Sequence, residues 1–392
     1  MTEGIEIDRV RADTPGCSKV LHFNNAGAGL PAQPVLDAQI AHLKREAEIG
    51  GYEAAAEAET AIANSYDAIA KLINCRRDEI ALVENATVGW DMAFHAFGFR
   101  PGDRILTAEA EYASNYIAYL RAAEFCGAKV EVVPSDESGQ LSVSALEDMI
   151  DDKVKLISIT HVPTNGGLVN PAAAIGRVAR AAGIPFLLDA CQSVGQLQVD
   201  VEEIGCDLLT ATGRKYLRGP RGTGFLYVRN SLLDTLQPPF VDLHAAEWVA
   251  PDRYTLRPDA RRFENWEFNY AAVIGLGVAV DYALDLSLEA IETRVGWLAR
   301  RLRSILADDM KLPVYDLGEQ KCGIVTFSLP DRTAEQMQQT LRAKGINVST
   351  STPASTRLDA EKRALPDVIR ASVHYYNTEE EIDRFCWALR QP

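Results

Sequence analysis

Two ionisable side chains stand just after apolar runs in the middle of the chain. Asp189 follows the run 184–188, and Lys215 comes shortly after the run 206–211. Such runs are typical of buried strands, and α/β folds place their sites at the carboxyl ends of strands. A carboxylate and an amine at that edge suggest pyridoxal phosphate (PLP), with Lys215 as the Schiff-base lysine and Asp189 holding the proton on the pyridine nitrogen. These residues therefore predict a reaction that begins with loss of a group from an amino acid's α-carbon.

Further polar residues could complete such a cofactor site. Gln192 follows Asp189 by three residues and could donate a hydrogen bond to the phenolic oxygen of the ring. Tyr112 begins a predicted helix and could stack on a flat cofactor, although an isolated tyrosine is more often half-buried core. Thr212 and Arg214 offer a hydroxyl and a guanidinium to a phosphate, which suits the planar donor fork of arginine.

The segment 81–87 leads from a predicted strand into an amphipathic helix. Asn85 and Thr87 can cap this helix and leave its first backbone N–H groups free to receive an anion. Taken alone, the fragment favours a plain helix cap. The hydroxyl of Thr212 and the guanidinium of Arg214 could reach the same phosphate, and this makes the helix start a candidate phosphate site.

Two other segments could reach a substrate. Arg370 shares one face of a predicted strand with Val368 and Ser372, and a guanidinium among apolar strand residues needs an anion. A structural salt bridge or a substrate carboxylate would serve equally well. The loop Asn25–Gly29 needs either close backbone approach or positive φ angles, and it could line a site.

Composition excludes several classes of function. The 392 residues are 47% hydrophobic, enough for a large core and for more than one domain. The net charge of −15, without a long basic run, argues against nucleic acid as a partner. The first residues lack a secretory signal and no stretch approaches the ~18 apolar residues of a membrane span, so we expect a cytoplasmic protein with no membrane partner. Seven scattered cysteines and six dispersed histidines argue against a disulfide framework and against a metal site.

Strand-like and helix-like runs alternate between residues 80 and 230. This alternation predicts an α/β fold with a doubly wound, mainly parallel sheet. The expected strands are 80–84, 104–107, 129–133, 155–161, 185–189, 207–210 and 224–228. The expected helices between them are 88–97, 115–126, 143–150 and 172–182.

The pattern changes after the proline-containing segment 237–240. An irregular stretch runs to about residue 262, and helices are expected at 271–286 and 288–306. The last 80 residues predict a small α+β unit with strands 324–329, 346–350 and 368–376 and helices 334–344 and 379–389. We therefore expect a large PLP-binding domain over 20–262, and a small domain with connecting helices from 1–19 and 263–392.

Four motifs in one order resemble the class V aminotransferase and cysteine desulfurase-like superfamily of PLP enzymes, fold type I, over essentially the whole chain. They are Asp189–Gln196, Thr212–Lys215 with the glycine-rich run 219–224, Arg370–Ser372 with 376–378, and the loop His161–Gly167. The resemblance implies a homodimer in which each active site is completed by the neighbouring subunit.

The resemblance also implies a role for each candidate residue. Lys215 would carry the cofactor, Asp189 would contact the pyridine nitrogen and Gln192 the phenolic oxygen. Tyr112 would stack on the ring, and Arg370 would bind the substrate carboxylate. The phosphate would be held by Ala86, Thr87, Thr212 and Arg214. The loop residue Thr164 is expected to bind the cofactor, and Asn25 and Ala26 are expected to bind the substrate.

The chain departs from the family pattern at two places. Desulfurases carry a nucleophilic cysteine on a mobile loop after the strand expected at 346–350, and counting from that strand puts Ala354 at this position. Without a thiolate, no persulfide can form there. In the segment 264–269, relatives often have a Gly-Thr pair that reaches the phosphate of the other subunit. This chain has Glu267 there, which cannot stabilise a phosphate, so the residue that crosses the interface is open.

The favoured function is a PLP-dependent β-eliminating C–S lyase for a cystine-like or cysteine-sulfoxide-like substrate. A class V aminotransferase is the second candidate and an amino-acid epimerase, similar to isopenicillin N epimerase, the third. All three need removal of the α-proton, for which Lys215 is the natural base. The rival class is a non-catalytic α/β binding protein, which should lack a complete lysine and aspartate pair.

Overall fold

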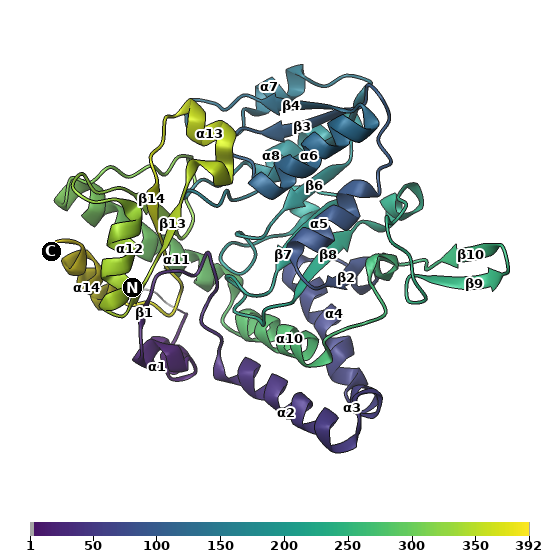
Figure 1. Ribbon diagram of the computed structural model, residues 1–392, viewed down its shortest axis with the longest axis horizontal. Coiled ribbons are helices and arrows are strands. Elements are labelled where there is room, and N and C mark those ends of the chain that lie inside the picture. The colour runs from purple at the N-terminus through teal and green to yellow at the C-terminus, as the bar shows by residue number, and fades with distance from the viewer. Residues whose placement is uncertain (1–3, 392) are drawn as a thin grey trace.

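The computed structural model describes residues 4–391 and is built around a seven-stranded sheet (Figure 1). The strand order is β2-β8-β7-β6-β5-β3-β4. β8 is antiparallel to both of its neighbours, and the remaining pairs are parallel. The predicted α/β fold with a mainly parallel sheet is confirmed. The strands are β2 (Ile80–Val83), β3 (Arg104–Ala108), β4 (Lys129–Val133), β5 (Val154–Thr160), β6 (Phe186–Asp189), β7 (Leu208–Thr212) and β8 (Gly224–Val228).

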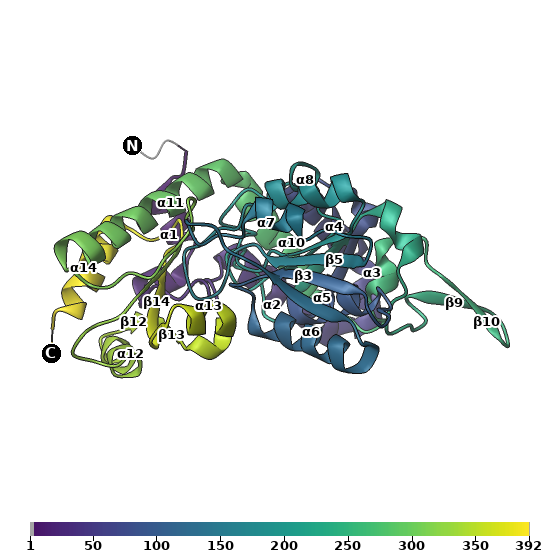
Figure 2. The same cartoon turned by 90° about the horizontal axis from the view of Figure 1, so that it is seen from above.

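Helices cover both faces of this sheet (Figure 2). One face is covered by α4 (Glu59–Ile73), α7 (Val143–Asp148), α8 (Ala172–Ala182), α9 (Val201–Ile204) and α10 (Tyr270–Asp285), and the other by α5 (Ala86–His95) and α6 (Ala113–Cys126). Along β5, Ile157 and Ile159 are buried against the first group of helices and Leu156 against the second. This alternation follows from the two-residue period of a strand, and it explains why the strands read as continuous apolar runs.

A second core lies beside the sheet, on the left in Figure 1. It contains the antiparallel sheet β11-β14-β13 and the parallel pair β1-β12, packed against α1, α11, α12 and α14. The bounds are β1 (Leu21–His22), β11 (Ile324–Phe327), β12 (Ile346–Asn347), β13 (Ser349–Ser351), β14 (Val368–Ser372), α1 (Ile7–Ala12), α11 (Leu288–Ser304), α12 (Ala334–Ala343) and α14 (Glu379–Leu389). Val273 and Leu276 of α10 pack into the core of the seven-stranded sheet. The domain boundary at residues 262 and 263 stays a prediction.

Three segments differ from what the sequence predicts. The stretch expected to be irregular up to residue 262 contains the hairpin β9 (Ala246–Ala250) and β10 (Arg253–Leu256). Its side chains are largely exposed, with Trp248 at 71%, so it lacks the alternation that marks a half-buried strand. The strand expected at 368–376 ends at Ser372, because the backbone N–H of His374 donates to Asn377 Oδ1 in a turn (2.8 Å). The segment after β13 forms a 3-10 helix (Pro353–Thr356) and α13 (Arg357–Lys362).

The amino-terminal part of the chain also holds helices that were not predicted, α2 (Gln33–Ile49) and α3 (Gly51–Glu57) in addition to α1 and α4. Within the described residues, no single helix is long and apolar enough to cross a membrane. The bent pair α10 and 288–309, with an angle of 80° between its parts, meets that criterion by length and composition only.

Candidate active site

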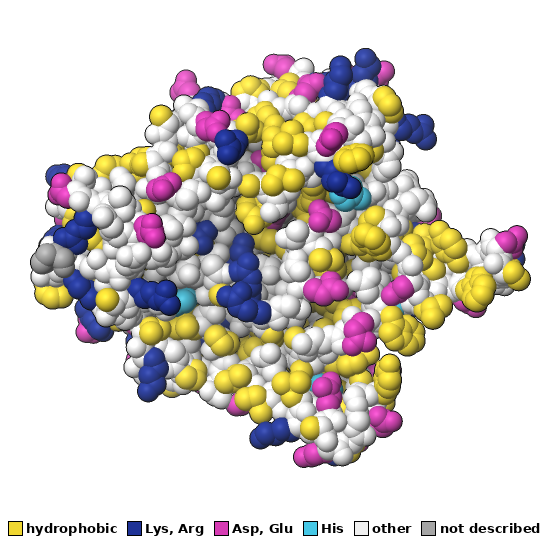
Figure 3. Space-filling view, in the orientation of Figure 1, with side chains coloured by type: hydrophobic (Ala, Val, Ile, Leu, Met, Phe, Trp, Pro, Cys, Tyr) yellow, Lys and Arg dark blue, Asp and Glu magenta, His cyan; other side chains and the backbone are white. Residues whose placement is uncertain are grey.

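A cavity lies at the carboxyl ends of β5, β6 and β7. All nine predicted cofactor-binding residues line it: Ala86, Thr87, Tyr112, Thr164, Asp189, Gln192, Thr212, Arg214 and Lys215. Four further lining residues are Asn85, Thr160, Val162 and Cys191. Figure 3 shows Lys and Arg side chains gathered near the middle of the molecule, where the second core meets the sheet.

One end of the cavity is suited to an anion. The Asn85 side chain caps α5 by accepting from the backbone N–H of Val88 (3.0 Å), as predicted. The N–H groups of Ala86 and Thr87 belong to the first turn, which has no acceptors within the helix. Arg214 adds a guanidinium, whose Nη1 donates to the Gly27 carbonyl. Backbone donors, the helix dipole and a cation thus converge on this end.

The cavity is also lined by the carboxylate of Asp189, a residue that is 6% exposed. Its Oδ2 accepts from Asn115 Nδ2 and its Oδ1 accepts from the backbone N–H of Cys191, both at 3.0 Å. Among residues 4–391, no Lys, Arg or His side chain forms an ion pair with Asp189 within 4.0 Å. A buried carboxylate that lacks a cation is ready to receive a ligand carrying a positive group.

Lys215 projects into the cavity from the turn after β7. Burial holds the pKa of its amine below the ordinary value, while the negative charge of Asp189 opposes this shift. The loop 25–29 packs on the same turn so closely that a Cβ at Gly29 would lie 2.6 Å from the Lys215 carbonyl oxygen. The sequence predicts either close backbone approach or positive φ angles for this loop. At Gly29 the structure shows close backbone approach.

Gln192 is 3% exposed and forms part of the cavity wall. Its Nε2 donates to the Ala26 carbonyl (3.1 Å), while its Oε1 has no hydrogen-bond partner among the residues that the structure describes. The predicted donation to a phenolic oxygen would therefore use the second N–H of the amide group. A buried, unpartnered amide oxygen is a sign that a ligand completes this wall.

The predicted substrate-binding residues lie behind the cavity wall. Arg370, 8% exposed on β14, donates from Nη1 to Thr164 Oγ1 (2.6 Å), and its buried Nε has no partner. No carboxylate of the described residues lies within 4.0 Å of this guanidinium, so a structural salt bridge does not account for it. Asn25 Nδ2 donates to the Ser372 carbonyl (2.7 Å), and the backbone N–H of Ala26 donates to Ser372 Oγ (2.9 Å). These bonds attach the 25–29 loop to β14.

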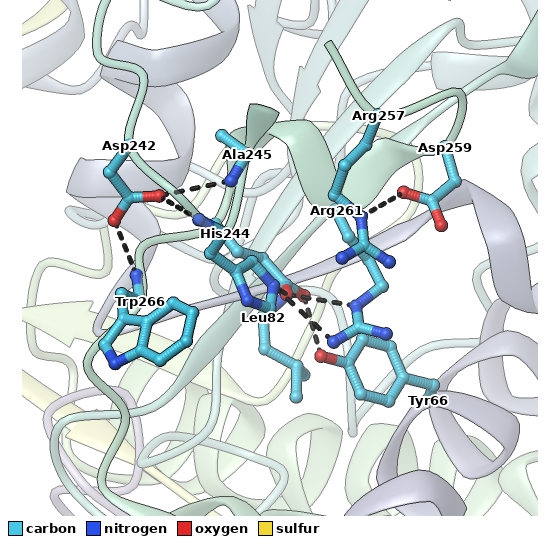
Figure 4. Close-up of polar contacts among 10 residues, drawn as sticks. Tyr66, Leu82, Asp242, His244, Ala245, Arg257, Asp259, Arg261 and Trp266 are labelled. Carbon is cyan, nitrogen blue, oxygen red and sulfur yellow. Dashed lines mark hydrogen bonds and ion pairs between the residues drawn. The ribbon is translucent and has the colours of Figure 1, made fainter. Parts of the chain in front are cut away.

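The segment 264–269 is fixed by a buried carboxylate. Figure 4 shows Tyr66, Leu82, His244 and Arg261 converging at its start. There Glu264, 1% exposed, accepts from Tyr66 Oη and the Leu82 backbone N–H (both 2.8 Å) and contacts His244 Nε2 (2.7 Å) and Arg261 Nε (3.2 Å). Glu267 is exposed. The residue that would reach a neighbouring subunit stays open.

Sequence reasoning missed Glu111, Asn115 and Cys191, all of which lie in or next to the cavity. Glu111 precedes a helix, where acidic residues are common, so its type and position gave no distinctive signal. Asn115 lies in the first turn of α6, and only the fold brings it to Asp189. Cys191 could have been noticed from its place between Asp189 and Gln192.

The residues present fit PLP. The start of α5 and Arg214 can hold its phosphate, Asp189 its pyridine nitrogen and Lys215 its aldehyde carbon. Among the described residues Arg370 Nε is a buried donor without a partner that a substrate carboxylate would satisfy, and Gln192 keeps one amide N–H for the phenolic oxygen.

An α/β fold with an amine and a buried carboxylate in one cavity at the strand ends fits a PLP-dependent enzyme of fold type I. Residues 20–385 match the family model Aminotransferase class-V, and the chain belongs to this family. It is 29% identical to a probable cysteine desulfurase of Methanothermobacter thermautotrophicus over 381 residues, which is 95% of this chain and 94% of that protein.

Solved structures of two related proteins have a similar fold. The apo structure of a cysteine desulfurase from Thermococcus onnurineus NA1 matches with a TM-score of 0.90 and 27% identity, over 97% of this chain and 96% of that one. A complex of the cystine C-S lyase C-DES with its product cysteine persulfide matches with a TM-score of 0.85 and 24% identity, over 96% of this chain and 98% of that one. The second likeness shows the shared fold.

Proposed function

We propose that this PLP enzyme is a β-eliminating C–S lyase that acts on a cystine-like or cysteine-sulfoxide-like amino acid and forms no persulfide on the protein. One sequence feature carries the proposal: counting from the strand expected at 346–350, Ala354 falls where desulfurases hold their nucleophilic cysteine. A methyl group has no lone pair with which to attack a sulfur atom.

The structure of this loop supports the proposal. Ala354 lies in the 3-10 helix Pro353–Thr356, next to α13, and the stretch 351–366 contains no cysteine. Asn165 Nδ2 donates to the Thr352 carbonyl (3.2 Å) and to Thr356 Oγ1 (2.9 Å). These bonds attach the loop to the 161–167 segment, from which Thr164 lines the cavity.

Cys322 and Cys191 are poor replacements for a mobile thiolate. Cys322 is 1% exposed, and burial raises the pKa of its thiol to about 11. Cys191 lines the cavity, but burial and the charge of Asp189 raise the pKa of its thiol as well. Since the thiolate is the nucleophile, a thiol that stays protonated at neutral pH does not take up sulfur efficiently.

The side chains divide the work of elimination among them. PLP supplies an electron sink for the substrate α-carbon, which allows a β-substituent to leave. In this proposal Lys215 Nζ takes the α-proton, and its lowered pKa keeps more of the amine in the neutral form that accepts a proton. Asp189 holds the proton on the ring nitrogen. Arg370, beside Thr164, orients the substrate carboxylate.

A substrate panel tests the reaction type. Holoenzyme is incubated with cystine, S-oxidised cysteine derivatives, cysteine and alanine. Pyruvate and ammonia in equal amounts from the first two support the lyase. Transfer of the amino group to a keto acid would instead show an aminotransferase. Inversion at the α-carbon without loss of the substrate would show an epimerase. Mass analysis after turnover checks the cysteines, and a sulfur adduct lost in a Cys322→Ala or Cys191→Ala variant would overturn the proposal.

We also propose that the protein is a homodimer. Phe240, Trp248 and Trp266 are exposed by 72, 71 and 55%, and hydrophobic side chains gather around the β9–β10 hairpin in Figure 3. Large exposed aromatic groups of this kind are typical of contact surfaces. Sedimentation of the wild type and of a Trp248→Glu variant tests the proposal. A wild type that sediments as a monomer at micromolar concentration would contradict it.

A further inference from the structure

Glu111 lies directly behind the cavity, in the turn between β3 and α6, and is 3% exposed. Its position just before α6 places the carboxylate at the positive end of the helix dipole. Neither the cofactor site nor the proposed elimination uses this residue.

The Glu111 carboxylate connects several parts of the cavity wall. Oε1 accepts from the backbone N–H of Tyr112 (2.8 Å), from Asn115 Nδ2 (3.0 Å) and from the Thr160 hydroxyl. Oε2 accepts from Thr107 Oγ1 (2.9 Å) and from the backbone N–H of Thr160 (3.1 Å). Tyr112 and Thr160 line the cavity themselves. A shift of this carboxylate would therefore move both of them.

Glu111 and Asp189 share one donor. Asn115 Nδ2 lies 3.0 Å from Glu111 Oε1 and 3.0 Å from Asp189 Oδ2. Within residues 4–391, neither carboxylate has a Lys, Arg or His partner within 4.0 Å. The other titratable group that the charge of Glu111 acts on is Tyr119 of α6, which is buried and whose hydroxyl donates to Ser158 Oγ (2.8 Å). One buried acid thus lines the cavity and a second lies behind it, and among residues 4–391 neither forms an ion pair within 4.0 Å, although Lys215 lines the same cavity.

We propose that Glu111 is a positioning residue whose carboxylate, acting through Asn115 and Asp189, adds a second negative charge behind the cofactor ring and helps to keep the ring nitrogen protonated. The inference rests on Asp189 as the partner of that nitrogen. With PLP bound, Asp189 would have an ion-pair partner in a protonated ring nitrogen, and the charge of Glu111 would add to the stabilisation of that proton. Burial and the charge of Asp189 raise the pKa of Glu111 to about 7, so a cation bound there would favour ionised Glu111.

The test measures the ring nitrogen directly. Enzyme reconstituted with PLP labelled with ¹⁵N in the ring is followed by NMR between pH 6 and 9, because the ¹⁵N shift distinguishes the protonated from the unprotonated nitrogen. The wild type should stay protonated over the range. Glu111→Gln should lose ring protonation within it and bind PLP about tenfold more weakly, as expected for loss of one nearby charge. Glu111→Asp, which keeps the charge, should recover part of both effects.

Two controls separate the possible outcomes. Glu264→Gln changes another buried acid with at least four hydrogen-bonding partners and should leave the ¹⁵N shift unchanged. Asp189→Asn should deprotonate the ring more strongly than Glu111→Gln. If Asp189→Asn has no effect, the assignment of Asp189 fails. If Asp189→Asn acts and Glu111→Gln matches the wild type, only the role of Glu111 is overturned.

If Glu111→Gln does not fold, a measurement on the wild type tests whether Glu111 becomes ionised when PLP binds. Infrared spectra of protein with ¹³C-labelled glutamate carboxyl groups are recorded near pH 7 before and after addition of PLP. Loss of a protonated carboxyl band on binding is the expected result, because the bound cation favours the ionised acid. A band that does not change would contradict the proposal.

Discussion

Glu111 and Glu264 are both buried acids with several hydrogen-bond donors, and they contact different strands of the seven-stranded sheet, Glu264 contacting β2 and Glu111 contacting β3 and β5. Glu264 is contacted by Arg261 and His244 and joins the segment after the hairpin to β2. Glu111 has polar donors but, within residues 4–391, no cationic side chain within 4.0 Å, and a second acid, Asp189, shares its Asn115. The Glu264 cluster carries its own counter-charge, whereas the pair at the cavity leaves a charge for a ligand to balance. This difference separates a site that holds the fold together from one that is completed by binding.

The largest effect is expected at the cavity, for Lys215→Ala. Removal of the base and attachment point should lower turnover by about 10⁴-fold, near the upper end for loss of a proton-transferring group. The thermal midpoint of the cofactor-free protein should change little, because the amine stabilises no neighbouring element. Steady-state kinetics and differential scanning calorimetry measure the two quantities. Turnover within tenfold of the wild type would contradict the assignment.

Glu264→Ala should show the opposite pattern. It leaves Tyr66 Oη and the Leu82 N–H without their acceptor and Arg261 without its partner, so the free energy of unfolding should fall by about 3 to 5 kcal/mol. Urea denaturation of the cofactor-free protein measures this loss. We expect Glu264 to stabilise the fold and not to bind the cofactor. A variant that is as stable as the wild type but has lost its affinity for PLP would contradict this expectation.

Glu111→Gln should change how stability depends on pH. The folded-state pKa of Glu111 is raised from 4.5 to about 7, so the folded protein holds a proton that the unfolded chain has released between these values. The contribution of this group is therefore fully present below pH 4.5 and is lost as pH rises to about 7. Relative to Glu111→Gln, the cofactor-free wild type should lose about 3 kcal/mol over this window. Urea titrations at pH 5 and 8 measure the difference, and parallel pH profiles would count against the raised pKa.

The smallest effect is expected for His244→Gln. His244 is one of several partners of Glu264, and Arg261 remains in place, so the loss should be about 1 kcal/mol, typical of one hydrogen bond. Urea denaturation and a PLP titration measure stability and affinity. A loss comparable to that of Glu264→Ala would show that His244, rather than the guanidinium, supplies the counter-charge.

Much of the sheet could be predicted because its strands are buried on both faces. Runs such as 184–188 read as apolar whichever face they present, and Asp189 and Lys215 stand out because a charge follows each run. The hairpin β9–β10 escaped detection because its side chains face solvent. Glu111 and Asn115 escaped because their meaning depends on β6, about 75 residues along the chain, whose end supplies Asp189. Local pattern carries no information about such a contact.

The glycine loop at 25–29 also constrains the order in which the protein can fold. Leu21 pairs with Ile346, Asn24 forms a bridge with Ser372, and Gly29 rests on the turn that carries Lys215. During synthesis the start of the chain must wait until residue 372 has left the ribosome before these contacts can form. Closure of such a long loop is slow relative to local structure. The seven-stranded sheet and the residues that line the cavity can therefore assemble first, and the 25–29 loop and β14, which support the cavity wall, can join them only when nearly the whole chain has been made.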